Sequence, residues 1–271
     1  MAPRITARGI PSIRNDTIYR LAVDSTRYRD LGSILLLDDA VIALGTGIAA
    51  SDRRRIETIV ENRNTHDCHP PLTRGDGWVH LSGVAGYALL DGADAKVIRE
   101  TRTGRWRDID KGATTGGDST PVTRHYTTIL IDHGIDPRRA RYAYAVLPDA
   151  SIAQTAAYGR RIEILANSGV VQAISRDNVL AAVFWHAGTV ETADGPLTAD
   201  GPCTLLIRRD HKRVRLAVSD PSRTADEVKI TLPWPVKSVK ESDRRVRKAK
   251  HAVKVKVGGS RGHAHTAVVR V

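Results

Sequence analysis

The stretch Leu35-Leu-Leu-Asp-Asp-Ala-Val-Ile-Ala-Leu-Gly-Thr-Gly-Ile48 places two aspartates between two apolar runs. Asp is favoured in tight turns because its side chain bonds to nearby backbone, whereas Leu, Val and Ile pack well in buried strands. The stretch therefore predicts a β-hairpin with Asp38-Asp39 in its turn. We expect opposing sheets to bury the apolar faces of this hairpin and the aspartates to be solvated.

Short β-rich runs alternate with turn signals along the whole chain, which is typical of an all-β sandwich protein. The run Tyr142–Leu147 is apolar on both faces and predicts a central strand. The other strand candidates in the first part are Tyr19–Val23, Ala40–Gly45, Ile56–Glu61, Val84–Leu90 and Tyr126–Asp132. Those in the second part are shorter: Val170–Ile174, Val179–Phe184, Cys203–Ile207, Val214–Val218 and Val228–Leu232. The segment Thr114-Thr-Gly-Gly117 predicts a surface loop.

One helix is predicted, over Ser151–Tyr158. Ser151 and Gln154 have the spacing of a capping box, and Gly159 stands where a C′ glycine ends a helix. We place a domain boundary at Gly159–Arg161. The predicted domains are residues 1–160 and residues 161–271.

The end of the second domain also carries a β pattern. The segments His251–Val257 and His265–Val271 alternate apolar and polar residues. They predict a terminal hairpin with Gly258-Gly259 in its turn.

Positive charge is concentrated at the end of the chain. The formal net charge is +12, and residues 237–271 hold eleven Lys or Arg and two acids, which leaves +9 in this segment. A basic field favours anionic partners such as nucleic acid, anionic lipid or acidic polysaccharide, and it does not choose among them.

Cysteine usage and apolar content exclude some classes of protein. Cys68 and Cys203 lie far apart, so no disulfide framework is predicted. The segment Met1–Pro11 has no apolar core and does not predict a secretory signal. No apolar run approaches the ~20 residues that span a bilayer, so we expect no membrane partner.

The order of several blocks resembles the C-terminal half of polysaccharide lyase family 8, which contains hyaluronate, chondroitin and xanthan lyases. The chain departs from that family before the Asp-Asp turn, where Ile34–Leu37 replaces the usual aromatic residues by aliphatic ones. The resemblance continues more weakly around Val179–Phe184 and Cys203–Val218. The blocks that carry it are Asp38-Asp39, Ala43–Ile48, Thr58–Arg63, Gly83–Tyr87, Gly104-Arg105-Trp106, His133-Gly134, Pro137 and Tyr142–Pro148.

The resemblance implies both a fold and a chemistry. It implies the later part of an antiparallel β supersandwich over residues 1–160 and a smaller C-terminal β-sandwich over residues 161–271. Family members cleave acidic polysaccharides by β-elimination, with Asn, His, Tyr and Arg of an α/α toroid and a Glu near the start of the β region. Those motifs precede the segment that matches here, so no residue of this chain receives a catalytic role, and no cofactor or metal is expected.

Three clusters of chemically active residues have an alternative structural interpretation. Glu61-Asn62-Arg63 places an acid, an amide and a guanidinium together, but neighbouring strand residues point to opposite faces, so a structural role is favoured. His66-Asp67-Cys68-His69 offers nitrogen and sulfur ligands, yet no second ligand cluster accompanies it, so a solvated loop is favoured over a zinc site. Tyr126, Asp132 and His133 invite a triad hypothesis, but no nucleophile elbow is present, and a turn is favoured.

Two kinds of residue are candidates for binding polysaccharide. The basic run Arg244, Arg245, Arg247, Lys248 and Lys250 could neutralise a polyanion, or it could be a solvated strand edge protected by charge. Trp106 could stack on sugar rings. Core positions are nonetheless favoured for all four tryptophans, Trp78, Trp106, Trp185 and Trp234.

These observations leave three hypotheses for function. The first is the β portion of a polysaccharide lyase, inactive alone, whose partner could be a separate toroid chain. The second is a non-catalytic module that binds acidic polysaccharide. The third is a basic β-protein that binds nucleic acid non-specifically. The resemblance implies an extracellular location, although the chain shows no export signal.

Overall fold

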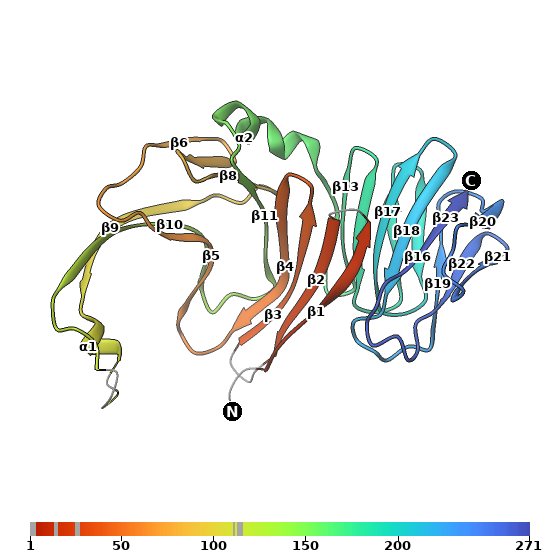
Figure 1. Cartoon of the computed structure of the whole chain (residues 1–271), viewed down its shortest axis with the longest axis horizontal. Coiled ribbons are helices and arrows are strands. Elements are labelled where there is room, and N and C mark those ends of the chain that lie inside the picture. The colour runs from red at the N-terminus through yellow and green to blue at the C-terminus, as the bar shows by residue number, and fades with distance from the viewer. Residues whose placement is uncertain (1–3, 14–15, 25–27, 111, 113–115) are drawn as a thin grey trace.

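The described part of the chain forms four antiparallel sheets of eight, three, seven and five strands. The computed structural model describes residues 4–13, 16–24, 28–110, 112 and 116–271, with side chains from Asp30 onward. Figure 1 shows the sheets stacked along the long axis in the order three, eight, seven and five strands. The predicted all-β fold is confirmed. None of the described helices is long and apolar enough to cross a membrane.

The eight-stranded sheet contains the hairpin that the opening stretch predicts. Strands β3 and β4 pair from Tyr28↔Ala50 to Leu37↔Ala40, with Asp38-Asp39 in the turn. This hairpin prediction is confirmed. The spatial order of the sheet is β1-β2-β3-β4-β11-β8-β7-β6. The bounds are β1 (Arg4–Ile13), β2 (Asp16–Asp24), β3 (Tyr28–Leu37), β4 (Ala40–Ala50), β6 (Leu72–Gly75), β7 (Trp78–Leu81), β8 (Ala85–Leu89) and β11 (Ala140–Pro148).

The three-stranded sheet covers one end of the eight-stranded sheet. Its order is β5-β10-β9, with β5 (Arg55–Asn64), β9 (Lys96–Gly104) and β10 (Val122–Ile135). Val60 and Ile129 from this sheet share a core with Leu81 and Tyr87 from the eight-stranded sheet. Central strand β11 contributes Tyr144 to this core. The predicted central position of β11 is confirmed, since it pairs with β4 on one side and β8 on the other.

The predicted helix is present as α2 (Ile152–Tyr158). Ser151 Oγ accepts from the backbone N–H of Gln154, and the Gln154 side chain accepts from the backbone N–H of Ser151, which completes the capping box. The glycine prediction is wrong in detail. Gly159 keeps a right-handed φ of −56° and begins the 3-10 turn η1 (Gly159–Arg161), so the helix ends by tightening and not at a left-handed glycine.

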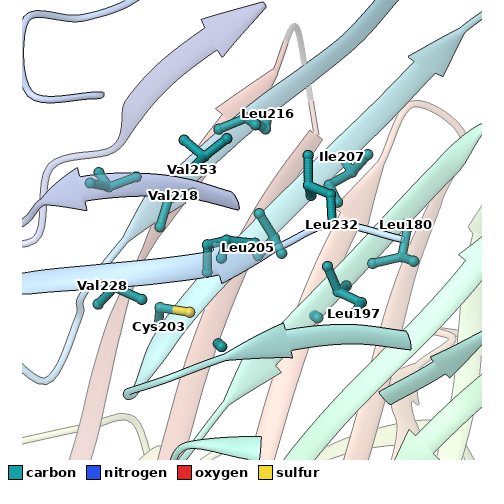
Figure 2. Packing of buried hydrophobic residues seen from close by; sticks show 14 of the residues in the cluster. Leu180, Leu197, Cys203, Leu205, Ile207, Leu216, Val218, Val228, Leu232 and Val253 are labelled. Atoms are coloured by element: carbon teal, nitrogen blue, oxygen red, sulfur yellow. The ribbon is translucent and has the colours of Figure 1, made fainter. Parts of the chain in front are cut away.

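Two further sheets form the C-terminal β-sandwich. Their strands close on a core of aliphatic side chains that includes Leu197, Leu205 and Val253, each fully buried (Figure 2). The seven-stranded sheet has the order β12-β13-β14-β17-β18-β23-β20, and the five-stranded sheet has the order β15-β16-β19-β22-β21. The bounds are β12 (Glu163–Asn167), β13 (Val171–Arg176), β14 (Val179–Phe184), β15 (Gly188–Thr192), β16 (Gly195–Ala199), β17 (Cys203–Asp210), β18 (Arg213–Ser219), β19 (Glu227–Thr231), β20 (Ser238–Lys240), β21 (Val246–Ala249), β22 (Ala252–Lys256) and β23 (His265–Arg270).

The predicted terminal hairpin is wrong, because β22 and β23 belong to different sheets. Strand β22 pairs with β19 and β21, whereas β23 pairs with β18 and β20. The backbone N–H groups of Val257 and Gly258 both donate to the carbonyl of Asp226, at 2.9 and 2.8 Å. These bonds hold the chain where it leaves the five-stranded sheet, so the glycines begin a crossing between the two layers.

The eight-stranded and seven-stranded sheets pack face to face. Leu35, Ile42 and Leu44 of the first hairpin lie in one buried cluster with Ile174 and Leu206 of the seven-stranded sheet. The hairpin therefore buries its apolar face against the C-terminal sandwich. This packing agrees with the expectation that an opposing sheet covers the hairpin.

Ion pairs extend this contact to the hairpin turn. Arg176 on β13 holds Asp39 through both terminal nitrogens, with Nη2 2.7 Å from Oδ2. Arg208 on β17 lies 3.6 Å from Asp38. The hydrogen bond from Arg176 lowers the pKa of Asp39 below its usual value. The aspartates are exposed, as expected, but each also pairs with the facing sheet.

A buried polar network crosses the same interface. Asn167 Nδ2 donates to the carbonyls of Gly45 and Tyr142, each at 3.1 Å. Gln172 Nε2 donates to Asn167 Oδ1 at 2.9 Å and to the Leu31 carbonyl at 3.3 Å. Tyr142 and Leu31 both adjoin register shifts of their strands. The amides of the second sandwich thus satisfy carbonyls next to irregularities in the first.

We predict that Gln172→Leu lowers the free energy of unfolding by about 2–4 kcal/mol, because it leaves buried partners unpaired. Gln172 is fully buried, and its Oε1 also accepts from Trp185 Nε1 at 3.2 Å. Urea unfolding followed by tryptophan fluorescence measures the change. The matched control is Gln154→Leu on exposed α2, which loses only a cap and costs ~1 kcal/mol. Equal losses for the two variants would contradict a role for the network.

Candidate functional site

A long β-hairpin with an exposed aromatic tip extends from the three-stranded sheet. Strands β9 and β10 pair from Lys96↔Leu130 out to Gly104↔Val122, and the connection carries helix α1 (Trp106–Ile109). We call residues 96–135 the β9–β10 arm. Figure 1 shows α1 at its tip, at the opposite end of the molecule from the C-terminal sheets.

The tip of this arm presents apolar side chains to solvent. Trp106 is 60% exposed and Ile109 is 77% exposed, and α1 has no buried residue. The preference for a core position is therefore wrong for Trp106, because no second layer covers the tip of the arm within the described residues.

The segment after α1 returns tightly against Trp106. A Cβ on Gly117 would lie 2.5 Å from the carbonyl carbon of Trp106 and 2.6 Å from its Cβ. The backbone N–H of Arg107 donates to the carbonyl of Asp118 at 3.2 Å. These contacts fix the start of α1. The predicted loop Thr114-Thr-Gly-Gly117 lies largely outside the described residues.

Two arginines flank the exposed indole. Arg105 and Arg107 are exposed, and within the described ranges their side chains make no hydrogen bond or ion pair. Further along the arm, Arg102 stacks on Tyr126 at 4.2 Å and pairs with Glu100. The tip therefore combines an exposed aromatic ring with two exposed arginines adjacent to it in the chain, and guanidinium groups suit an anionic ring substituent such as a carboxylate.

The Glu61 cluster serves to join two sheets. The Tyr87 hydroxyl donates to Glu61 Oε2 at 2.6 Å, and Arg63 Nη2 donates to the same oxygen at 3.0 Å. Burial, followed by the bond to Glu61, raises the pKa of Tyr87. Asn62 faces the other way, and its Oδ1 accepts from Thr128 at 3.3 Å. The favoured structural interpretation of this cluster agrees with these contacts.

The histidine–cysteine segment forms no metal site in the part of the chain described. No group of three or more possible ligands gathers there or elsewhere among those residues. Cys68 is exposed, and the His69 ring lies 4.7 Å from the ring of His125. The backbone N–H of His66 donates to Asn64 Oδ1 at 2.9 Å, which shapes the loop.

The residues of the triad hypothesis have separate partners. His133 Nε2 lies 2.7 Å from Thr58 Oγ1, and Asp132 pairs with Arg55. The backbone N–H of Gly134 also donates to Asp132 Oδ1 at 2.9 Å and lowers the pKa of that carboxyl. Tyr126 lies under Arg102. The structure does not bring Asp132, His133 and Tyr126 together.

The basic run lies on and around edge strand β21 of the five-stranded sheet. Arg245 Nη1 donates to the Gly258 carbonyl at 2.7 Å and to Ser260 Oγ at 3.1 Å. Arg247 pairs with Glu227 at 2.6 Å, and Lys248 Nζ donates to the Lys237 carbonyl at 2.9 Å. Three of the five basic side chains are therefore held by the sandwich itself.

The remaining two, Arg244 and Lys250, are exposed and have no side-chain bond to any other described residue. They lie in the C-terminal sandwich, whereas Trp106 lies at the tip of the β9–β10 arm at the other end of the molecule (Figure 1). The sequence-predicted binding residues thus form two separate surfaces and not one site.

The other tryptophans have different surroundings. Trp185 is buried at 8% exposure, while Trp78 and Trp234 are partly buried. Trp234 lines a hollow together with residues from three hairpin turns. No local pattern predicts this hollow, because its residues come from separate strand connections that only the packing of two sheets brings together.

Comparisons with known proteins agree with this architecture. Residues 25–159 match the family model "Polysaccharide lyase family 8, super-sandwich domain", and residues 163–229 match "Polysaccharide lyase family 8, C-terminal beta-sandwich domain". The two matched segments are consecutive, and between them they cover most of the strands described above.

Relatives and solved structures carry related names. A hyaluronate lyase of Thermasporomyces composti is 39% identical over 83% of this chain and 31% of its own length. A xanthan lyase of Bacillus sp. (strain GL1) is 33% identical over 70% of this chain and 23% of its own. The crystal structure of Streptomyces coelicolor A3 chondroitin AC lyase with chondroitin sulphate matches 96% of this chain and 36% of that one, at 33% identity and a TM-score of 0.83.

The chain thus spans about a third or less of the length of these relatives. The match nevertheless runs through both β domains in the same order as in the family models. This chain belongs to polysaccharide lyase family 8.

Proposed function

We propose that this chain supplies the β portion of a lyase that cleaves an acidic, uronate-containing polysaccharide by β-elimination. The observation that carries the proposal is the ordered match to both β domains of the family, with relatives named hyaluronate and xanthan lyase. The chemistry needs a base for the proton next to the uronate carboxylate. It also needs a group that stabilises the resulting charge and an acid for the leaving oxygen.

The described side chains do not offer such an acid–base set. Tyr87 is fully buried and its hydroxyl donates a hydrogen bond to Glu61, which also accepts from Arg63 and from the backbone N–H of Asn62. A phenol with a raised pKa in this setting is a poor base at neutral pH. The contribution that the geometry supports is therefore contact with the polymer and not proton transfer.

The tip of the β9–β10 arm is the surface that best suits this contact. Trp106 offers an apolar face to the C–H side of a sugar ring, and the neighbouring Arg105 and Arg107 can donate to a carboxylate. Because the arm extends away from the sheets, its tip can reach a polymer held elsewhere in a complete enzyme (Figure 1).

We predict that the purified chain releases no unsaturated uronate from hyaluronate, chondroitin sulfate or xanthan. Ultraviolet absorbance of the new double bond follows the reaction. A complete enzyme of the family run in parallel shows that each substrate is competent. Turnover by this chain clearly above the buffer rate would contradict the division of roles proposed here.

We predict that Trp106→Ala weakens hyaluronate binding about tenfold, since stacking on an exposed indole contributes ~1–2 kcal/mol. Arg105→Gln with Arg107→Gln weakens binding further and removes most of its salt dependence. The matched control is Arg213→Gln, an exposed arginine on β18. Binding isotherms at two salt concentrations measure these effects. Unchanged affinity in the arm variants would exclude the arm as the contact.

A second candidate function is non-specific binding of polyanions, including nucleic acid, by the end of the C-terminal sandwich. The exposed Arg244 and Lys250 favour it, since Arg245, Arg247 and Lys248 already have partners. Such binding rests on charge and not on shape. The affinity should therefore be weak. It should fall steeply as the salt concentration rises, because counterion release then contributes less to binding.

We predict that Arg244→Ser with Lys250→Ser removes most DNA binding that is sensitive to salt, weakens hyaluronate binding less, and leaves the unfolding midpoint unchanged. Arg245→Ser is the contrasting variant, because it breaks bonds to Gly258 and Ser260 and should lower the midpoint. Affinity for both polymers and thermal unfolding are measured together. Binding that survives the double replacement would locate the polyanion contact on another surface.

A further inference from the structure

A hollow of about 380 Å³ opens in the C-terminal sandwich, away from the β9–β10 arm. Trp234, in the connection between β19 and β20, forms one wall. Turns β13–β14, β15–β16 and β17–β18 bring Asn178, Asp194 and His211 to its edge. Residues from both sheets of the sandwich therefore converge on one concave surface.

The hollow combines an apolar lining with an ordered polar edge. Val179, Leu180 and Ile207 supply aliphatic surface. At the edge, Arg209 Nη1 lies 3.0 Å from Asp194 Oδ2, and the guanidinium carbon lies 4.7 Å from the centroid of the Trp234 ring. The aromatic ring and the ion pair thus hold each other in position.

This pairing determines which ligand charge the hollow favours. Arg209 and Asp194 neutralise each other, so a bound carboxylate would have to displace Asp194 from its partner. A guanidinium next to a carboxylate instead offers donors and acceptors side by side, which matches the neighbouring hydroxyls of a neutral sugar. The aliphatic lining and the indole suit the C–H face of the same ring.

One polar atom in the wall is also unsatisfied. The Trp234 indole Nε1 is buried and has no hydrogen-bond partner among the described residues. A buried N–H without an acceptor is unfavourable. The Arg209 side chain covers the ring and is 38% exposed, and binding would require it to shift for a ligand oxygen to reach this N–H.

We infer that this hollow binds a neutral hexose unit of a polysaccharide. Its volume lies within the usual range for small-molecule sites, and the balance of apolar lining and few polar groups is typical of them. The inference goes beyond the proposed function, because the hollow belongs to the other sandwich and uses no residue of the arm. This hollow would be a second point of attachment for a polysaccharide, in addition to the tip of the β9–β10 arm.

The test follows the indole N–H signals of uniformly ¹⁵N-labelled protein during titration with cellotetraose, a neutral tetrasaccharide. Trp234→Phe assigns the Trp234 signal. We expect this signal to shift at low and at high salt, while the signal of Trp185, whose indole is bonded to Gln172, stays fixed. Asp194→Ala should weaken the titration about tenfold, as expected for loss of a hydrogen bond to a charged group.

Trp106→Ala is the control that separates this site from the arm, and it should leave the cellotetraose titration unchanged. A hyaluronan hexasaccharide is titrated in parallel. A Trp234 signal that responds only to this acidic ligand, or only at low salt, would overturn the inference of a neutral-sugar site. No response of the Trp234 signal to saturating cellotetraose would overturn it as well.

Discussion

The stack of four sheets depends on one interface that combines apolar packing with hydrogen bonds between the two sandwiches. The opening hairpin and the seven-stranded sheet exclude water from each other with aliphatic side chains. The carbonyls of Leu31, Gly45 and Tyr142 would be costly in such a place, and the amides of Asn167 and Gln172 satisfy them. Shape and polar pairing therefore select the same docking of the two sandwiches.

Polar residues that resemble a catalytic set likewise satisfy one another between sheets. Glu61, Arg63 and Tyr87 lie where the three-stranded sheet meets the eight-stranded one, and each uses its charge or proton to satisfy another. The tip of the arm differs because no layer covers it among the described residues. Trp106 keeps an open face, and Arg105 and Arg107, its neighbours in the chain, are exposed as well.

The sequence pattern predicted those features that depend on interactions between residues close together in the chain. The Asp38-Asp39 turn, the capping box of α2 and the central strand β11 all follow from side chains close in sequence. The prediction of a terminal hairpin was wrong. Alternating apolar and polar residues in β22 and β23 indicate that one face of each strand is buried, but they do not indicate which strand each one pairs with. The hollow beside Trp234 had no sequence signal, since three distant turns create it.

Strand β23 has a kinetic consequence for folding. It lies between β18 and β20, although a whole series of five-stranded-sheet elements separates it from β18 along the chain. During synthesis the seven-stranded sheet cannot close until residues 265–270 have emerged, so β18 waits with an open edge. The chain must close a long loop before β23 can pair with β18, and this costs conformational entropy. Completion of the sandwich is therefore a slow folding step, during which the open edge of β18 can aggregate.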